Sequence, residues 1–240
     1  MKDSRTREWS AQLEGQPAEE ILTWTARRFA PRVAFGTGFG PEGCVLIHLI
    51  AEHALPIDVF TLDTGLLFPE TVELWQRLEA RYGLRIRAVR PALSVEEQAA
   101  AHGEALWARD PDRCCGLRKV APLQRQLAGI DAWITAIRRD QTAARARAAI
   151  VERDAESDRV KVNPLATWSS SDVWSFIHAN DVPYNLLHER GYPSIGCVPC
   201  TTAVAAGEDP RAGRWRGREK TECGLHAAIP VPLQLISSRS

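Results

Sequence analysis

Cysteines are the residues of this chain best suited to chemistry, and their spacing sorts most of them into two pairs and one lone thiol. Cys114 and Cys115 are adjacent in "CCGLRK", and Cys197 and Cys200 form a Cys-x-x-Cys pair in "GCVPC". Cys223 stands apart from both pairs, in "KTECGLH". In a reducing compartment such cysteines serve more often as metal ligands or reactive thiols than as structural disulfides.

The two pairs predict a metal centre. Four thiolates are soft ligands, which select zinc or an iron–sulfur cluster. Adjacent cysteines strain a chelate on one zinc ion, because zinc sites commonly space their cysteines by two to four residues. A cluster presents several iron atoms, so Cys114 and Cys115 can reach different ones. The pattern favours an iron–sulfur cluster, with a zinc site and uncoordinated thiols as the alternatives.

Cys223 is left over from this four-ligand site and is a candidate nucleophile. Positive charge favours the thiolate, which is the nucleophilic form. The nearby cationic residues are Arg211, Arg214, Arg216, Arg218, Lys220 and His226. The same cations can hold a phosphate or sulfate through charge-assisted hydrogen bonds. A basic surface tail with an incidental cysteine is the competing interpretation. Cys44, inside the apolar run "CVLIHLI", is expected to pack in the core.

A glycine-rich turn, "AFGTGFGPEG", follows an apolar segment and enters a helical one. Its backbone amides and the helix N-terminus favour a phosphate or sulfate ligand. It lacks the Walker lysine and the dinucleotide-binding spacing. The stretch "LDTG" ends the next expected strand, at the sheet edge where open α/β folds bind ligands. Two such turns favour a nucleotide pocket over plain strand-to-helix connections.

The elements that carry these residues alternate along the chain. Apolar segments predict strands at 32–36, 57–63, 84–89 and 131–139, and amphipathic segments predict helices at 17–29, 41–53, 69–83 and 169–181. This order favours an α/β fold, a parallel sheet wrapped by helices. The charged stretch 139–159 is expected to be a surface excursion, and the chain after Gly191 a mobile C-terminal segment. We expect an N-terminal helical segment (1–30), a nucleotide- and cluster-binding α/β domain (31–200) and a C-terminal segment with the candidate catalytic cysteine, Cys223 (201–240).

Composition narrows the class of protein. The chain has 240 residues, 45% of them hydrophobic, which is ample for a core. Its 30 basic and 30 acidic residues cancel, so the net basic field typical of nucleic-acid binding is absent. There is no signal-peptide pattern and no apolar run of the ~20 residues that a membrane span needs. We expect a cytoplasmic protein with no membrane and no nucleic-acid partner; a homo-oligomer stays open.

Together, "KTECGLH", "CCGLRKVAPL", "GCVPC", "LDTGLLFPET" and "GEDPRAGRW" resemble the assimilatory adenylyl-sulfate reductases of the iron–sulfur type, within the phosphoadenylyl-sulfate reductase family. The likeness extends from about Val33 to His226. It implies an adenine nucleotide alpha hydrolase-like fold and one [4Fe-4S] cluster per chain. It also implies thioredoxin-dependent reduction of adenylyl sulfate to sulfite and AMP, through an S-sulfocysteine.

The resemblance also assigns roles to residues of this chain. Cys223 matches the nucleophile, and the cluster ligands match Cys114, Cys115, Cys197 and Cys200. The implied substrate-binding residues are Gly36, Thr37, Gly38, Phe39, Leu62, Asp63, Thr64, Gly65, Lys119, Arg138, Arg211, Arg214 and His226. From the residues alone, Lys119 is equally well a solvated surface lysine. Too few residues follow His226 for a thioredoxin-like domain, so an external thioredoxin or glutaredoxin is implied as electron donor.

Three other functions compete with this interpretation. A reductase for the 3′-phosphorylated substrate is the first, although enzymes of that preference usually lack both cysteine pairs. An ATP pyrophosphatase-type thiolating enzyme is the second, but it needs a loop close to "SGGxDS", from which "GTGFGPEG" departs. The third is a non-enzymatic nucleotide-binding protein with a structural metal, for which Cys223 has no role.

Overall fold

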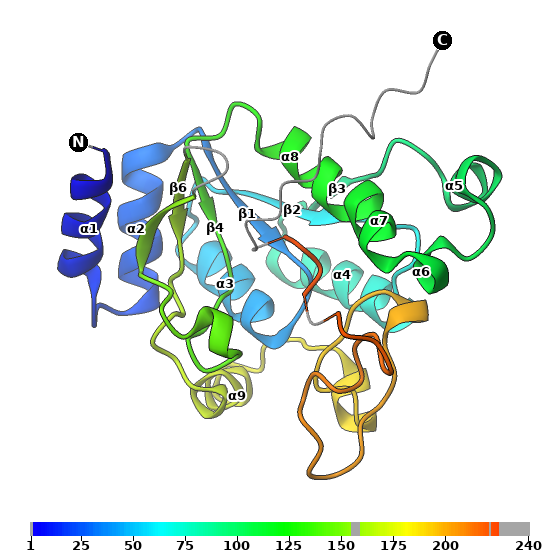
Figure 1. Cartoon of the computed structure of the whole chain (residues 1–240). Helices are drawn as coiled ribbons and strands as arrows, with labels where there is room; N and C mark the ends of the chain where they lie inside the picture. Colours follow the sequence, from blue (N-terminus) through cyan, green and yellow to red (C-terminus); the bar gives the residue numbers. More distant parts are fainter. Residues whose placement is uncertain (1, 155–158, 221, 226–240) are drawn as a thin grey trace.

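A computed structural model describes residues 2–154, 159–220 and 222–225 of the chain (Figure 1). The α-helices are α1 (Lys2–Leu13), α2 (Ala18–Phe29), α3 (Pro41–Glu52), α4 (Pro69–Tyr82), α5 (Val95–His102), α6 (Leu106–Arg109), α7 (Pro111–Cys115), α8 (Ala121–Leu127) and α9 (Ser170–Ala179). The strands are β1 (Val33–Thr37), β2 (Asp58–Leu62), β3 (Arg87–Val89), β4 (Ala132–Ile134), β5 (Val151–Asp154) and β6 (Arg159–Val162). A π-helical turn, η1, and three 3-10 turns complete the set: η1 (Gly116–Val120), η2 (Ala143–Arg145), η3 (Leu186–Arg190) and η4 (Val198–Cys200).

The six strands form one sheet in the order β3-β2-β1-β4-β6-β5. The pairs β1–β2, β2–β3, β1–β4 and β4–β6 are parallel, which confirms the predicted parallel sheet. The chain runs outward from β1 to β3 and then returns to the other side of β1 with β4. The loops after β1 and β4 therefore leave in opposite directions, which opens the crevice where open α/β sheets bind ligands.

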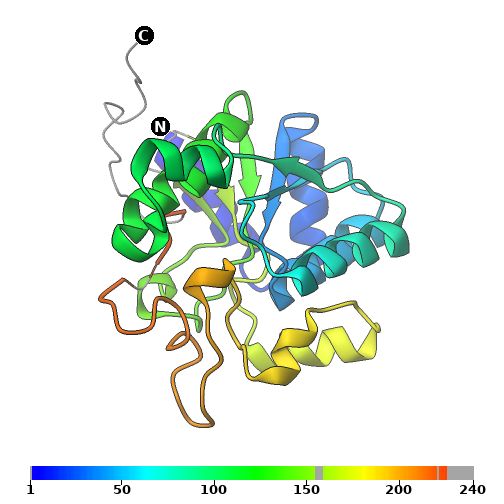
Figure 2. The ribbon, with the colours of Figure 1, turned by 90° about the vertical axis from the view of Figure 1, so that its right-hand side faces the viewer.

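Helices cover both faces of the sheet (Figure 2). Side chains of successive strand residues point to opposite faces. Phe35 of β1 is buried in the larger core, together with residues of α2, α3, α4 and α9. Its neighbour Ala34 lies in a smaller core with Phe60 of β2 and Leu123 of α8. Burial on both faces explains why β1 and β2 read as continuous apolar runs in the sequence.

The charged stretch 139–159 differs from the expected surface excursion. Val151–Asp154 forms the edge strand β5, which pairs antiparallel with β6 and places Val151 opposite Val162. Both valines are buried, whereas Glu152 faces Lys161 across the ladder in an ion pair of 2.8 Å. An edge strand with one solvated face carries such charges. The charge density therefore marked a half-buried strand, and the prediction of a loop was wrong there.

The N-terminal helices belong to the same packing unit as the sheet. Ile21 and Leu22 of α2 are fully buried in the larger core, and α1 lies along β5 (Figure 1). The division at residues 30 and 200 stays a prediction. Among the residues that the structure describes, no helix is both long and apolar enough to cross a bilayer.

Candidate active site and metal centre

A cavity of about 740 Å³ opens at the carboxyl ends of β1, β2 and β4. This volume suits a nucleotide-sized ligand. Its wall includes most of the residues that the sequence assigned to substrate and nucleophile: Gly36, Thr37, Gly38, Phe39, Leu62, Thr64, Lys119, Arg138, Arg211, Arg214 and Cys223. The edge of the sheet where the strand order reverses is therefore the place where the predicted residues meet.

Two predicted substrate residues, Asp63 and Gly65, do not line this cavity. Asp63 turns to the side, where it accepts hydrogen bonds from the Gly65 backbone amide (3.1 Å) and from Arg90 Nε (2.9 Å). Gly65 is part of the same turn and lies outside the cavity wall. These two residues shape the turn after β2, and their contact with substrate stays a prediction. His226 lies outside the described residues.

The turn after β1 is held by Thr37. Its Oγ1 accepts a hydrogen bond from the Phe39 backbone amide at 3.0 Å, and Phe39 adopts a left-handed conformation with φ of 58°. A Cβ atom at Gly43 would lie 2.7 Å from Thr37 Oγ1, so this position must be glycine for the turn to close. The turn leads into the N-terminus of α3, whose partial positive charge faces the cavity rim. An anion at this rim is stabilised by the helix terminus.

The two cysteine pairs lie beside the cavity, on neighbouring segments. Cys114 and Cys115 end α7, and α6 packs against η4, which carries Cys200 and follows Cys197 (Figure 1). Cys197 also lines the cavity, and its Sγ lies 3.4 Å from Thr64 Oγ1. Residues more than eighty positions apart in the sequence are thereby brought into one region of the fold.

The thiols of these pairs influence one another. Burial raises the pKa of Cys114, and negative charge on Cys197 and Cys200 raises it further. Burial also raises the pKa of Cys115, to about 12, against the opposing effect of Lys119. Thiolates here are therefore costly unless a cation neutralises them, as a bound metal does for its ligands.

The four thiols are soft donors, the chemistry that iron–sulfur clusters and zinc ions both take. Within residues 2–154, 159–220 and 222–225, no group of three or more His, Cys, Asp or Glu side chains is arranged to hold a metal ion. Four soft thiols on two segments suit a cluster, whose several iron atoms spread the ligands over a wider volume. Gln98 Nε2 donates a hydrogen bond of 3.9 Å to Cys114 Sγ, a contact of the kind that tunes the electron density of a metal-binding sulfur.

Arg118 links the turn after β2 to α5 through hydrogen bonds, a structural role that sequence analysis missed. This buried arginine donates to the Thr64 backbone oxygen at 2.6 Å and to the Gln98 side chain at 3.2 Å. Burial lowers its pKa, while charge on Cys114 and Cys197 opposes that effect. Arginine is rarely buried, so residue type offered no reason to expect a structural role for Arg118. Its closeness to the cysteines in "CCGLRK" was the only available signal.

Lys119 lies in the cavity wall, on the π-helical turn that follows Cys115. Burial by itself lowers its pKa, but negative charge on Cys197, Cys223 and Cys115 outweighs burial, and the pKa is raised. The side chain therefore stays an ammonium. It has no hydrogen bond or ion pair with any residue in the described part of the chain. Of the two positions that the sequence left open for Lys119, the solvated surface and the substrate pocket, the structure shows the pocket wall.

Arg214 is a second cation of the cavity wall. Its guanidinium stacks on Trp215 at 4.6 Å and donates to Ser194 Oγ at 3.3 Å. A Cβ at Gly196 would collide with Arg214 Nη2 at 2.3 Å, so the missing side chain of Gly196 makes room for the guanidinium. Its buried Nε has no partner among the described residues. Burial lowers the pKa of Arg214, and charge on Cys223 opposes this.

Arg138 differs from Lys119 and Arg214 because its charge is already neutralised. The buried guanidinium donates from Nε to Glu42 Oε1 at 2.9 Å and also pairs with Asp140. Glu42 stands in the first turn of α3, next to the glycine-rich turn. Arg138 therefore fastens the loop after β4 to the loop after β1.

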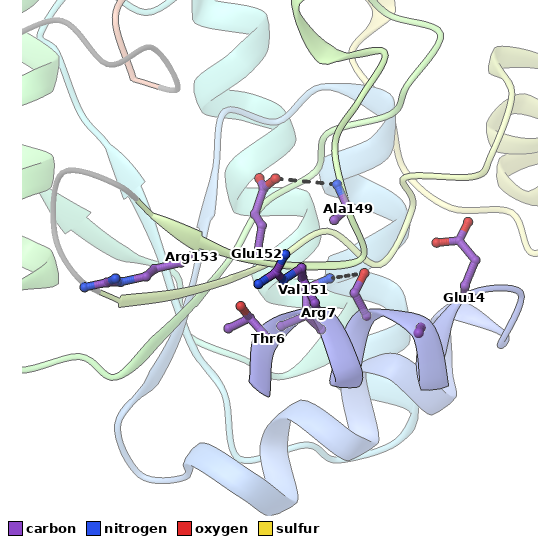
Figure 3. Close-up of a pocket in the computed structure, with 9 residues that line it drawn as sticks. Thr6, Arg7, Glu14, Ala149, Val151, Glu152 and Arg153 are labelled. Atoms are coloured by element: carbon purple, nitrogen blue, oxygen red, sulfur yellow. Dashed lines mark hydrogen bonds between the residues drawn. The ribbon is translucent and has the colours of Figure 1, made fainter. Parts of the chain in front are cut away.

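Cys44 and a second cavity are separate from this site. Cys44 is buried within α3, which confirms the predicted core packing. The second cavity, of about 480 Å³, lies between α1 and β5 (Figure 3). There Val151 N donates to Ser10 Oγ at 3.3 Å and Ala149 N donates to Glu152 Oε2 at 3.5 Å. Its wall has no cysteine.

This sheet, with a nucleotide-sized cavity at its switch point, has the adenine nucleotide alpha hydrolase-like fold. The FMN adenylyltransferase of Candida glabrata in complex with FAD and pyrophosphate shares this fold, with a TM-score of 0.56 and 18% identity over 90% of this chain and 74% of that one. Residues 32–203 match the phosphoadenosine phosphosulfate reductase domain, and the chain belongs to that family.

Two relatives support this membership. The adenosine 5′-phosphosulfate reductase of Oceanobacillus iheyensis is 44% identical over 92% of this chain and 93% of its own length. The phosphoadenylyl-sulfate reductase of Candida auris, solved as a phosphate complex, has a TM-score of 0.76 and 31% identity, over 85% of this chain and 98% of that one.

Proposed function

We propose that this protein reduces adenosine 5′-phosphosulfate to sulfite and AMP, with Cys223 as the nucleophile and an external thioredoxin or glutaredoxin as reductant. One observation carries the proposal: Cys223 shares the wall of a nucleotide-sized cavity with Lys119, Arg211 and Arg214. The curated relative named adenosine 5′-phosphosulfate reductase supports the choice of substrate. A thiol-dependent reductant accords with a reducing cytoplasm.

The chemistry is two successive displacements at sulfur. The Cys223 thiolate attacks the sulfate sulfur, the bond from sulfur to the bridging oxygen breaks, and AMP leaves with that electron pair. A thiolate of the reductant then attacks Sγ of the S-sulfocysteine, and sulfite leaves with the electrons of the S–S bond. The second thiol of the reductant resolves the mixed disulfide. The two electrons of the reduction come from this dithiol.

Cations of the cavity wall make the first displacement feasible. An anionic thiolate must approach an anionic sulfonate, and preorganised positive charge screens both. Lys119 and the buried Nε of Arg214 carry donors that no described residue uses. The amides after β1 and the N-terminus of α3 are placed for the phosphate. Leu62, Leu123 and Trp133 give the cavity an apolar wall suited to the adenine ring.

A [4Fe-4S] cluster, one per chain, would be held by Cys114, Cys115, Cys197 and Cys200. When bound, it supplies a fixed charge that tunes the field of the adjacent cavity and ties η4 to α7. Lys119 and Arg118 remain the groups that bring positive charge between these thiols and the cavity.

Mass spectrometry tests the proposed nucleophile. Mixing the protein with adenosine 5′-phosphosulfate, without reductant, should add one SO3 group to the peptide that carries Cys223. Steady-state rates should also favour this nucleotide over its 3′-phosphorylated form. An unmodified Cys223 peptide, with AMP still released, contradicts the covalent route. A clear preference for the 3′-phosphorylated nucleotide would make the protein a reductase of that substrate instead.

Lys119→Met should lower kcat/KM by about 10²–10³-fold, because it removes a preorganised positive charge from the transition state. Methionine keeps most of the side-chain length, so packing of η1 should persist. The measurement is the initial rate of sulfite release, with iron content and thermal stability as controls. A kcat/KM within twofold of wild type would remove Lys119 from the reaction.

A further inference from the structure

Glu222, the residue before Cys223, forms ion pairs in the cavity wall that have no role in the proposed reaction. Both of its carboxylate oxygens accept from Arg145 Nη2 at 3.2 Å, and Oε2 also lies 3.3 Å from Arg211 Nη2. The three side chains are largely covered, with 24%, 16% and 25% exposure for Glu222, Arg145 and Arg211. All three line the cavity. A carboxylate thus fills a site made by two guanidinium groups.

The body of the fold holds one of these arginines in place. Arg145 Nη1 donates to Gln141 Oε1 at 2.6 Å, and Gln141 Nε2 donates to Glu42 Oε1 at 3.1 Å. Glu42 also accepts from Arg138 at 2.9 Å. A continuous network therefore fixes Arg145 to the start of α3. The C-terminal segment, in contrast, supplies the carboxylate that occupies the site.

We propose that Glu222 is an internal competitor for the anion site of Arg145 and Arg211, and that the phosphate of an incoming nucleotide displaces it. The inference rests on the proposed function. Two guanidinium groups match one carboxylate or one phosphate group, and both anions together would repel each other at this distance. The nucleotide can bind only when Glu222 has left the site. The apparent affinity for the nucleotide is therefore the intrinsic affinity multiplied by the fraction of time that the site is empty.

The competition couples nucleotide binding to the position of the thiol. Because Glu222 and Cys223 are adjacent, release of the carboxylate releases the thiol as well. Glu222 is therefore a positioning residue: it holds Cys223 against the cavity wall in the nucleotide-free protein. By reciprocity, what weakens the Glu222 contact strengthens nucleotide binding.

The test is calorimetric binding of AMP and adenosine to the full-length wild-type protein, Glu222→Gln and the matched control Glu219→Gln. Glu219 is exposed and lies outside the cavity wall, so its substitution makes the same charge change elsewhere on the segment. If Glu222 fills the site about nine-tenths of the time, Glu222→Gln should bind AMP about tenfold more tightly. Adenosine, which lacks the phosphate, should bind the three proteins equally, and Glu219→Gln should match wild type.

A second readout follows the thiol directly. The rate at which iodoacetamide alkylates Cys223 in the nucleotide-free protein should rise several-fold in Glu222→Gln and stay unchanged in Glu219→Gln. AMP should accelerate this alkylation in wild type and have little effect in Glu222→Gln. Equal or weaker AMP binding by Glu222→Gln would overturn the competition while leaving the proposed reaction intact. Wild-type protein that binds no AMP at all would overturn both.

Discussion

Cys223→Ser is expected to abolish sulfite formation, with kcat/KM falling by about 10⁴-fold or more, because serine lacks the thiolate that attacks sulfur. A serine hydroxyl needs a general base to become nucleophilic, and the carboxylate beside position 223, that of Glu222, is already paired with Arg145 and Arg211. Sulfite release in the presence of thioredoxin is the measurement. AMP release before any reductant is added should be lost to the same extent.

The substitution leaves the remainder of the site in place, which supplies the control. Cys223 belongs to neither cysteine pair, so iron content and visible absorption of Cys223→Ser should equal those of wild type. AMP binding should persist, since the substitution leaves Arg145, Arg211 and Arg214 of the cavity wall in place. Sulfite production at more than about one-tenth of the wild-type rate would remove Cys223 as the nucleophile.

Cys197→Ala is expected to strip the protein of iron and of its visible absorption. Cys197 is buried, its Sγ is adjacent to Thr64 Oγ1, and its backbone forms an isolated bridge with Leu67. A ligand held this firmly on the cavity wall would anchor the proposed metal centre to the sheet. Losing one of four ligands should lower metal affinity by well over the ~10–100-fold that a second-shell change brings. Sulfite formation should fall with the iron.

Cys44→Ala is the matched control, with the same substitution at another buried cysteine. Cys44 is enclosed within α3 and contacts the Phe39 backbone oxygen at 3.8 Å, away from both pairs. It should keep full iron and activity, with a modest fall in thermal stability. Equal iron in Cys197→Ala and wild type, or stoichiometric zinc in the wild-type protein, would contradict the proposed cluster.

Much of the fold was predictable because its strands are apolar on both faces and its helices are amphipathic. The segments at 41–53 and 69–83 became α3 and α4 within one residue of their predicted limits. The edge strand β5 was missed because a short strand with one solvated face has no apolar run to reveal it, and β6 was missed because its four residues alternate charged and apolar side chains. Long-range pairing of β6 with β4, such as Val162 with Ile134, decided their conformation.

The site was predictable where side-chain type alone restricts the chemistry. Cysteines at these spacings have few uses, so Cys223 and the two pairs could be singled out from the sequence. Arginine and glutamate are common surface residues, and nothing local distinguishes Arg145 from Arg147 or Glu222 from Glu219. Their pairing joins positions 77 residues apart, which only the folded chain brings together.

By itself the sequence determined the parallel α/β architecture, the glycine-rich turn and the set of reactive thiols, because periodicity and residue chemistry are local properties. Tertiary structure decided which charges face the cavity: Lys119 without a partner among the described residues, Arg138 neutralised by Glu42, and Glu222 between two arginines. The reason is physical. The effect of a charge depends on burial and on its neighbours in space, and both are fixed only when distant segments pack together.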